Sequence, residues 1–514
     1  MKHTQILFSF ATTALLASCS LLLPSPHTKD ADYVMKHGQL QRIERKPMAR
    51  PLQIPSHYTQ IQFPDYQYIP PHPTAYRKKI SDSITGYLVP DRSLPFIRMS
   101  VFLRETTLPT KPEEAALYAV LSPMYRKGGS TTIAPTVLDD SLELLAASIG
   151  GDLGSFQSAL SLNCISRDFA KTLALLEDVY IKPAFDSTRL ELQKSIYLQN
   201  LLHKYDRPAD LLGGLSRYTL YESGPRLWNA KPEEVKKIQT KDLLALAKDR
   251  FATERVIFAV SGDFDPDTML TQLKAFFDKL PKKKNPSSKP TPILFKNKPG
   301  IYIADKKTTQ ANISMEQPFV QRPHPDFYAT SVASYILGGG GFTSRLTAKV
   351  RSDEGLAYSV HSSTESNYNE TGTTEISLQT KVSTAAYSIK LVIEEIQKLA
   401  KEGPTAEELA SAKKGLIESM PGIFESPTST ADAFARSELW GRSMDHFVLY
   451  PKEIEAVRAE DVKRCIAKYF DPARMTINIV GPADELLKAD TVHQASLQRF
   501  GKPRIIPLDS LEMR

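Results

Sequence analysis

The sequence predicts an α+β protein of two tandem related domains, each a mainly antiparallel sheet with helices on one face. One observation is length, because 514 residues exceed what a single compact domain usually holds. The other is an internal repeat: residues 233–263 align without a gap on residues 452–482, at an offset of 219. Each copy has the pattern of a helix, a short turn and an apolar strand that ends in glycine. So long an offset indicates a duplicated domain rather than a solenoid repeat.

The N-terminal segment 1–19 has the pattern of an export signal. Lys2 precedes an apolar run over 6–17, which is too short to span a bilayer and is typical of a signal peptide. The run ends in "LASC", which resembles a bacterial lipobox and makes Cys19 the candidate lipid attachment site; an ordinary secretory signal is the alternative. By resemblance to lipoprotein sorting in Gram-negative bacteria, Ser20 after the cysteine favours the outer membrane. We therefore expect a protein of the bacterial cell envelope, lipid-anchored and facing the periplasm.

Proline marks two connecting segments. Residues 20–75 hold nine of the 36 prolines and little apolar periodicity, which predicts an extended, semi-rigid N-terminal spacer. Residues 281–296 begin with a run of lysine, proline and serine and are interpreted as an interdomain linker. The two domains are then expected at 76–280 and 297–500. Residues 501–514 remain as a C-terminal tail.

Charge and cysteine content exclude two classes of protein. The net charge is only +7, and no basic block is interleaved with aromatic residues, so nucleic acid is not an expected partner. Three cysteines in a chain of this length do not make a disulfide scaffold. Cys164 and Cys465 lie in different halves and are interpreted as buried free thiols.

The second half shows its elements most clearly. Residues 386–402 carry a helical apolar stripe that Gly403 and a following proline should end. Thr405 and Glu408 then form the pattern of a capping box for the next helix. Two alternating stretches upstream predict an antiparallel hairpin, 356–368 and 372–380.

Residues 334–360 carry the segment "SYILGGGGFTSRLTAKVRSDEGLAYSV". This segment closely resembles the C-terminal half of the pitrilysin, insulinase and mitochondrial processing peptidase family. The same resemblance continues through "GPTAEELASAKKGL" at 403–416 and covers roughly residues 76–500. It implies that the two domains form a clamshell.

Active members of that family hold zinc in a first-half motif, H-x-x-E-H, together with a later glutamate. Aligning "MYRKGG" on the family pattern puts Ala119 and Pro123 where the histidines belong and Ser122 in place of the general base. Asn200 stands where the last glutamate belongs. Alanine and proline side chains offer no lone pair, and proline should also bend the helix. No two of the ten histidines lie within five residues of each other, so we expect no metal and no other cofactor in this chain.

The resemblance implies roles for residues that the second half keeps. Arg351 and Tyr358 match a pair thought to hold a substrate carbonyl and to donate to the oxyanion during water attack, here in trans at another subunit's site. Without the resemblance they are a surface charge and a sheet aromatic, and a relic pair is the remaining alternative. The glycine run is a candidate substrate-binding loop or merely a helix end: Gly338, Gly339, Gly340 and Gly341.

Three functions follow. The favoured hypothesis is a non-catalytic, substrate-binding subunit of a heterodimeric zinc metallopeptidase. The homologous partner subunit would carry H-x-x-E-H and the zinc, and the heterodimer would cleave unstructured peptides. The alternative is a lipid-anchored pseudoenzyme that binds peptides or acts as a scaffold without proteolysis. The third, ranked last, is a peptidase with an unrelated metal site.

Overall fold

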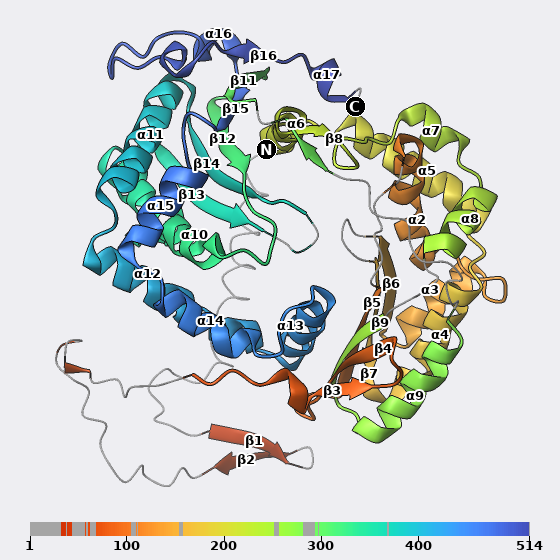
Figure 1. Ribbon diagram of the computed structural model, residues 1–514. Helices are drawn as coiled ribbons and strands as arrows, with labels where there is room; N and C mark the ends of the chain where they lie inside the picture. Colours follow the sequence, from red (N-terminus) through yellow and green to blue (C-terminus); the bar gives the residue numbers. More distant parts are fainter. Residues whose placement is uncertain are drawn as a thin grey trace, which may run out of the picture. The chain divides into compact units, whose positions relative to one another are not determined.

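The computed structural model divides the chain into two units, Met1–Gln67 and Tyr68–Arg514, shown in Figure 1. The residues that it describes are 32–36, 39–43, 57, 60–61, 68–103, 109, 111–153, 158–250, 256–280, 293–296, 298–366, 368 and 370–512. The signal segment, Cys19 and residues 281–292 of the linker lie outside these described residues. Among the described helices, none combines the length and apolarity needed to cross a bilayer.

The first unit contains an antiparallel pair of strands, β1 (Asp32–Lys36) and β2 (Gln39–Ile43). The spacer prediction did not include this pair. The two strands fall in the stretch between Pro26 and Pro47, which contains no other proline. Since proline cannot donate a hydrogen bond to a strand ladder, this stretch is the part of the spacer best suited to pairing.

The second unit holds one six-stranded sheet for each half. The first has the order β3-β4-β9-β5-β7-β6, antiparallel except for the parallel pair β4 and β9. Its strands are β3 (Arg77–Lys79), β4 (Ile84–Pro90), β5 (Phe96–Leu103), β6 (Ser148–Leu153), β7 (Ser158–Ile165) and β9 (Val256–Gly262). Its core includes residues of α2 (Ala115–Lys127), α3 (Pro135–Leu144), α4 (Phe169–Ile181), α5 (Ser187–Leu202), α7 (Pro232–Lys237), α8 (Thr240–Arg250) and α9 (Pro266–Asp278).

The second sheet has the order β13-β14-β12-β15-β11-β16, with β11 parallel to both of its neighbours. Its strands are β11 (Gly300–Asp305), β12 (Gln310–Pro318), β13 (Ala357–Glu365), β14 (Thr373–Lys381), β15 (Thr476–Gly481) and β16 (Arg504–Ile505). Its core includes residues of α10 (Asp326–Ser334), α11 (Ala385–Glu402), α12 (Ala406–Glu418), α14 (His446–Glu455), α15 (Ala459–Tyr469) and α16 (Ala483–Leu486). The predicted fold class is confirmed.

Local signals in the sequence produce the expected ends of elements. Helix α11 stops at Gly403, whose φ of 82° is in the left-handed region that favours glycine. Helix α12 begins with the predicted capping box, in which Glu408 N donates to Thr405 Oγ1 at 3.1 Å and Thr405 N donates to Glu408 Oε2 at 2.7 Å. The predicted hairpin is the antiparallel pair β13 and β14.

Two helices are exchanged between the halves. Helix α13 (Pro427–Leu439) belongs to the second half in sequence but packs on β4, β5 and β9 of the first sheet. Helix α6 (Pro208–Leu220) belongs to the first half but packs on β11, β12 and β15 of the second sheet. The bounds of the two helices differ by 219 residues at both ends, the offset of the internal repeat, so the exchange is reciprocal.

The exchanged helices cover the sheet faces opposite the domains' own helices. In β4, Leu88 joins the core of the first half's helices, whereas Tyr87 and Val89 contact the cluster around α13. This alternation follows from strand geometry, in which successive side chains point to opposite faces. The central strands β9 and β15 are therefore buried on both sides, which explains why β9 is a continuous apolar run rather than an alternating one.

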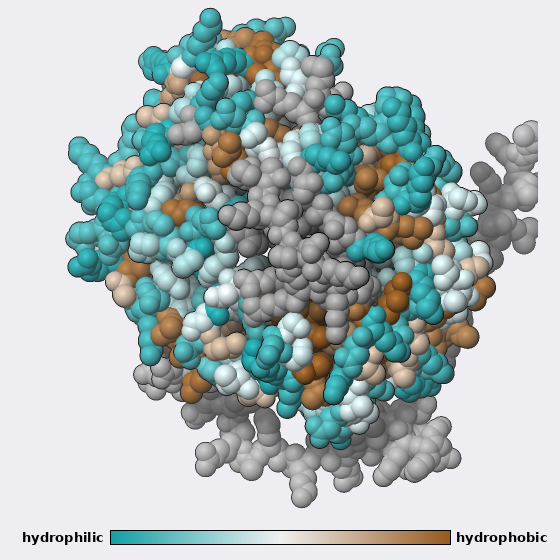
Figure 2. All heavy atoms as spheres, turned by 45° about the vertical axis from the view of Figure 1, so that its right-hand side comes forward, coloured by the Kyte–Doolittle hydropathy of each residue, from teal (hydrophilic) through white to brown (hydrophobic). Residues whose placement is uncertain are grey.

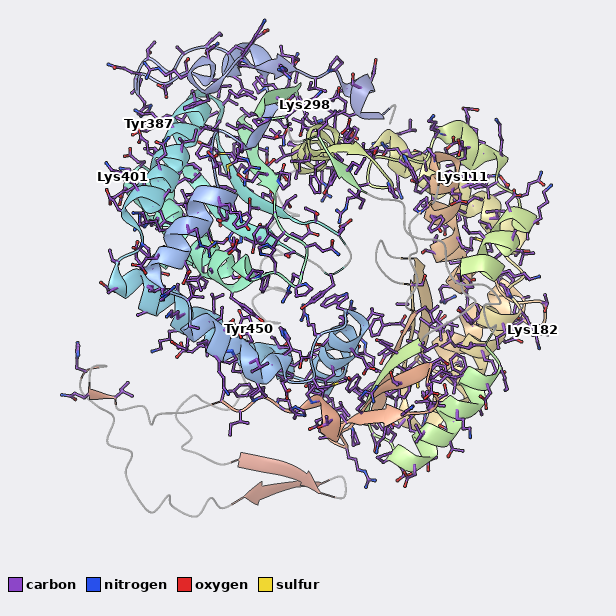
Figure 3. The ribbon with its side chains drawn as sticks, viewed as in Figure 1. Lys111, Lys182, Lys298, Tyr387, Lys401 and Tyr450 are labelled. Atoms are coloured by element: carbon purple, nitrogen blue, oxygen red, sulfur yellow. The ribbon has the colours of Figure 1, made fainter. Side chains whose placement is uncertain are left out.

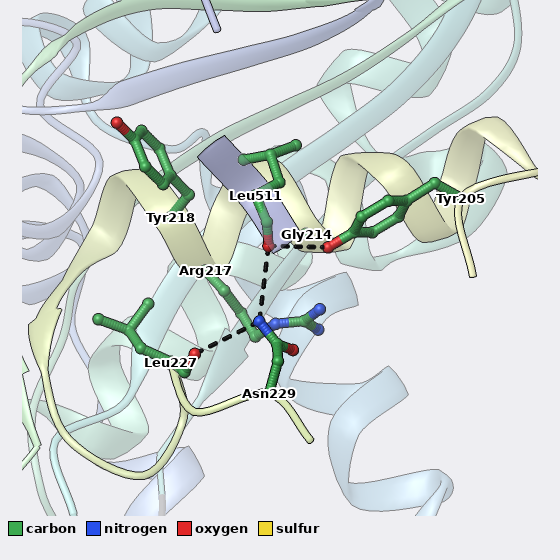
Figure 4. A pocket seen from close by; sticks show the side chains of 7 residues that line it. All are labelled: Tyr205, Gly214, Arg217, Tyr218, Leu227, Asn229 and Leu511. Carbon is green, nitrogen blue, oxygen red and sulfur yellow. Dashed lines mark hydrogen bonds between the residues drawn. The ribbon is translucent and has the colours of Figure 1, made fainter. Parts of the chain in front are cut away.

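The C-terminal tail helps to hold α6. Leu511 of α17 (Leu508–Glu512) is buried in the cluster that α6 forms on the second sheet. Its carbonyl oxygen accepts hydrogen bonds from the Tyr205 hydroxyl at 3.3 Å and from Asn229 Nδ2 at 3.5 Å (Figure 4). With β16 paired to β11, the described residues of the tail, 501–512, form part of the folded second half.

A buried carboxyl group lies under α6. Oε2 of Glu316 accepts hydrogen bonds from Ser216 Oγ of α6 at 2.6 Å and from Asn478 Nδ2 of β15 at 3.0 Å. Burial raises the pKa of Glu316 to about 7, and the carboxylate of Glu375, directly opposite on β14, adds to the increase.

Replacing Glu316 with glutamine should change how stability depends on pH. Between pH 4.5, the ordinary pKa of glutamate, and about 7, the folded chain keeps a proton that the unfolded chain has lost. Stability should therefore be highest at the acidic end of this range and fall by about 3 kcal/mol as the pH rises through it. Denaturant unfolding at several pH values measures the slope, which Glu316→Gln should abolish. The exposed Glu460→Gln is the control and should keep it; an unchanged slope in Glu316→Gln would refute the assignment.

Candidate functional site

The helix that the sequence alignment places at the family's zinc motif is α2. Ala119, Ser122 and Pro123 are half-buried on it, and the helix continues through Pro123 to Lys127. Proline has no amide hydrogen, so the carbonyl of Ala119 loses its ordinary intrahelical partner. Asn200 is exposed near the end of α5, which packs against α2.

No group of three or more His, Cys, Asp or Glu side chains that could hold a metal occurs among the described residues. His203, the one histidine in the first half's folded region, caps α5, and its Nδ1 lies 2.7 Å from Asp206 Oδ2. Chemically, α2 as it stands offers neither metal ligands nor a carboxylate base. Cys164 and Cys465 are buried and unbridged, as expected.

A cavity that sequence reasoning missed adjoins α2 and α5. It has a volume of about 300 Å³ and is lined by Ala115 of α2, by Asn200 and Tyr197 of α5, and by Lys204 and Trp228. Lys204 Nζ donates to Asn229 Oδ1 at 2.7 Å at the same place. The only sequence signal was Trp228, one of two tryptophans in the chain.

Arg351, Tyr358 and the glycine run come together in the second half. Arg351 lies in a π-helical segment, η7 (Thr347–Asp353), and Tyr358 near the start of β13. The guanidinium carbon of Arg351 is 5.4 Å from the Tyr358 ring centre and 4.7 Å from the ring centre of Phe342, which follows the glycines. These are cation–π distances. Tyr358 is 79% exposed and Phe342 is 72% exposed, so both rings face solvent.

The glycines of the run have structural reasons to be glycine. A Cβ on Gly338 would lie 2.7 Å from the backbone nitrogen of Ser362 on β13. A Cβ on Gly340 would lie 2.7 Å from the Tyr335 ring. Gly341 has a φ of 61°, so the turn that presents Phe342 needs its conformational freedom. Close packing against β13 thus positions the loop beside Arg351.

Ion pairs fix the segment that carries Arg351. The Arg345 guanidinium donates to both carboxylate oxygens of Glu408, at 2.6 and 2.7 Å, which ties η7 to the capping box of α12. Lys349 Nζ donates to Glu354 Oε1 at 2.9 Å and holds the pKa of that carboxyl below its usual range. Among the described residues, no carboxylate forms an ion pair with Arg351 itself, so its charge is available to a ligand.

The sequence is similar to a family model and to known proteins of the peptidase class that the resemblance indicated. The family model described as "Peptidase M16 inactive domain" matches residues 237–416. The non-peptidase homolog YmxG of Helicobacter pylori is 30% identical over 286 residues, which cover 54% of this chain and 65% of the relative, slightly less than two thirds of its length. An uncharacterized zinc protease of Streptomyces coelicolor is 22% identical over 423 residues, which cover 80% of this chain and 90% of the relative.

The fold itself has solved counterparts. The crystal structure of a peptidase M16 inactive domain from Pseudomonas fluorescens has a TM-score of 0.68 at 22% identity, covering 78% of this chain and 95% of that one. The resemblance drawn from residues 334–360 is thereby confirmed. Residues 237–416 thus match the inactive-domain model of the M16 peptidases, and the chain as a whole is similar to M16 peptidase homologues.

Proposed function

We infer that this chain is the non-catalytic, substrate-binding subunit of a heterodimeric zinc metallopeptidase. The observation that carries the proposal is the exposed cluster of Arg351, Tyr358 and Phe342, in which a cation contacts two solvent-facing rings and has no carboxylate partner among the described residues. Such a cation can hold a carbonyl or a developing oxyanion. Ala119, Ser122 and Pro123 on α2 provide neither a metal ligand nor a carboxylate base, so in this proposal the metal and the general base would come from another chain.

The catalytic roles would then be divided between two chains. The zinc of the partner subunit would activate the water that attacks the peptide. Arg351 of this chain would bind the substrate carbonyl through its planar fork of donors. The Tyr358 hydroxyl would donate to the oxygen that becomes negatively charged. The substrates would be flexible peptides that present an extended backbone.

Affinity capture tests the pairing. The tagged full-length chain, expressed in its own host, should co-purify with a homologue that carries an intact H-x-x-E-H. A chain that purifies only with bound peptides or unrelated partners would contradict the subunit proposal and support the pseudoenzyme, which binds without proteolysis.

We also propose that Cys19 carries the lipid that holds the protein at the outer membrane. Changing Cys19 to alanine should move the protein from the membrane fraction to the soluble fraction, because a thioether-linked diacylglycerol needs the thiol. Intact-mass measurement of the wild-type membrane form should show the added acyl mass. The matched variant Ser18→Ala should stay in the membrane. Equal fractionation of Cys19→Ala and wild type would refute lipidation.

A further inference from the structure

A second cavity, of about 190 Å³, lies in the second half between α10, α12 and α14. It is lined by two arginines that are 120 positions apart in the sequence, Arg322 before α10 and Arg442 before α14. Its other walls are mainly apolar and aromatic: Phe327, Leu416, Ile423, Phe447 and Tyr450, the last labelled in Figure 3.

The two positively charged arginines have no anionic partner among the described residues. Among the described residues, neither Arg322 nor Arg442 forms an ion pair with a carboxylate, and no acidic side chain lines the cavity. Nε of Arg442 is buried and has no hydrogen-bond partner within the described part of the chain. A buried donor without a partner costs free energy, so an unpaired donor of this kind points to a missing acceptor.

Aromatic rings support both guanidinium groups. The Arg322 guanidinium carbon lies 3.7 Å from the ring centre of Phe327 and 5.0 Å from that of Tyr368. The Arg442 guanidinium carbon lies 4.6 Å from the Trp440 ring centre and 5.3 Å from that of Tyr368. Cation–π contacts hold the planar groups in place and leave Nε of Arg442 without a hydrogen-bond partner among the described residues.

The electrostatics show that the two charges oppose each other. Burial lowers the pKa of Arg442. Burial and the neighbouring Arg442 charge lower the pKa of Arg322. Burial and both guanidinium groups lower the pKa of His446 to about 4, so His446 is neutral at neutral pH. Its Nε2 lies 3.3 Å from Arg442 Nη1 and can accept a hydrogen bond from it. The cavity therefore has two positive charges and no counter-charge from the residues that the structure describes.

We propose that this cavity binds a small dianion, a phosphate monoester or dicarboxylate with an apolar body. The two guanidinium groups donate hydrogen bonds to the anionic oxygens, because the N–H donors of arginine match carboxylate and phosphate oxygens in bidentate geometry. The apolar part packs against Leu416, Ile423 and Phe447. The volume of about 190 Å³ suits a small ligand.

Calorimetric titration and thermal melting of the full chain test this site. The probes are phenyl phosphate, phthalate and, as the neutral control, benzyl alcohol. Phenyl phosphate or phthalate should bind wild type and raise its melting temperature, and the tighter of the two identifies the anionic group. Arg442→Gln and Arg322→Gln should each weaken binding at least about tenfold, as loss of a charged hydrogen bond does. Arg504→Gln, which alters an arginine over Tyr302 elsewhere, should bind as wild type does.

The apo protein supplies a second readout. If the two arginines are there to bind a ligand, their charges repel each other in the ligand-free protein. Arg442→Gln removes one of these charges, so its melting temperature without a probe should be equal to or above that of wild type. Arg442→Lys, which keeps the charge but not the fork, should bind weakly. Equal binding by wild type and Arg442→Gln, no binding of either anion at millimolar concentration, or a lower melting temperature for apo Arg442→Gln would overturn the proposal.

Discussion

Replacing Glu438 with alanine should lower the free energy of unfolding of the second unit by about 3–5 kcal/mol. Glu438 lies on the exchanged helix α13, and its buried carboxylate is held by the first half's sheet. The Arg77 guanidinium donates to both of its oxygens, at 2.8 and 2.9 Å. Thr85 Oγ1 donates at 2.9 Å and the Tyr87 hydroxyl at 2.7 Å. Alanine would leave all of these donors without their acceptor at the surface where the two halves meet.

The Glu438→Gln variant and the pH dependence of stability distinguish the effect of the carboxylate's negative charge from the effect of the side chain's shape. Glu438→Gln keeps one acceptor oxygen and should cost less than Glu438→Ala. These contacts hold the pKa of Glu438 at about 2, so the stabilisation is present above pH 4.5 and is lost as the pH falls toward 2. Denaturant unfolding measures both effects, with the exposed Glu425→Ala as control. Equal stability of Glu438→Ala and Glu425→Ala would show that α13 is not anchored in this way.

Removing Arg351 should lower kcat/KM for peptide cleavage by the proposed complex at least about tenfold, as loss of a charged hydrogen bond to the substrate carbonyl does. Because Arg351→Ala removes both a substrate contact and positive charge, kcat should fall and KM should rise. Tyr358→Phe removes only the hydroxyl, so kcat should fall with KM nearly unchanged. Steady-state kinetics on the purified complex measures both.

The melting temperature of the variants and a substitution at an arginine outside the cluster provide the controls. Tyr358 and Phe342 are exposed, so changes in this cluster should leave the melting temperature within experimental error of wild type. Arg499→Ala, which changes an exposed arginine outside the cluster, should leave turnover unchanged. Wild-type turnover in Arg351→Ala would mean that the pair is a relic.

Local patterns in the sequence predicted much of the fold. The repeat placed α8 and β9 in one half and α15 and β15 in the other, because the periods of helix and strand are set by nearby residues. The exchange of α6 and α13 was not predicted, since it depends on which of two similar sheets a helix covers. A signal was present: the continuous apolar run of β9 indicates a strand buried on both faces.

The candidate site residues came from the family resemblance, and their role stays a prediction. Arg351 and Tyr358 are seven residues apart, and the structure brings both to one guanidinium–aromatic cluster. Phe342 was missed, although it directly follows the glycine run, because an exposed aromatic after a turn has many uses. Arg322 and Arg442 could not have been paired from the sequence, as only the tertiary fold brings them to one cavity.

The most direct test of the proposed division of labour is peptide cleavage and zinc content measured on this chain alone, on its H-x-x-E-H partner alone and on the two together. Zinc should be found only in the partner, and a flexible peptide should be cleaved rapidly only by the mixture. One tightly bound equivalent of zinc in this chain, or a partner that cleaves equally fast without it, would contradict the account.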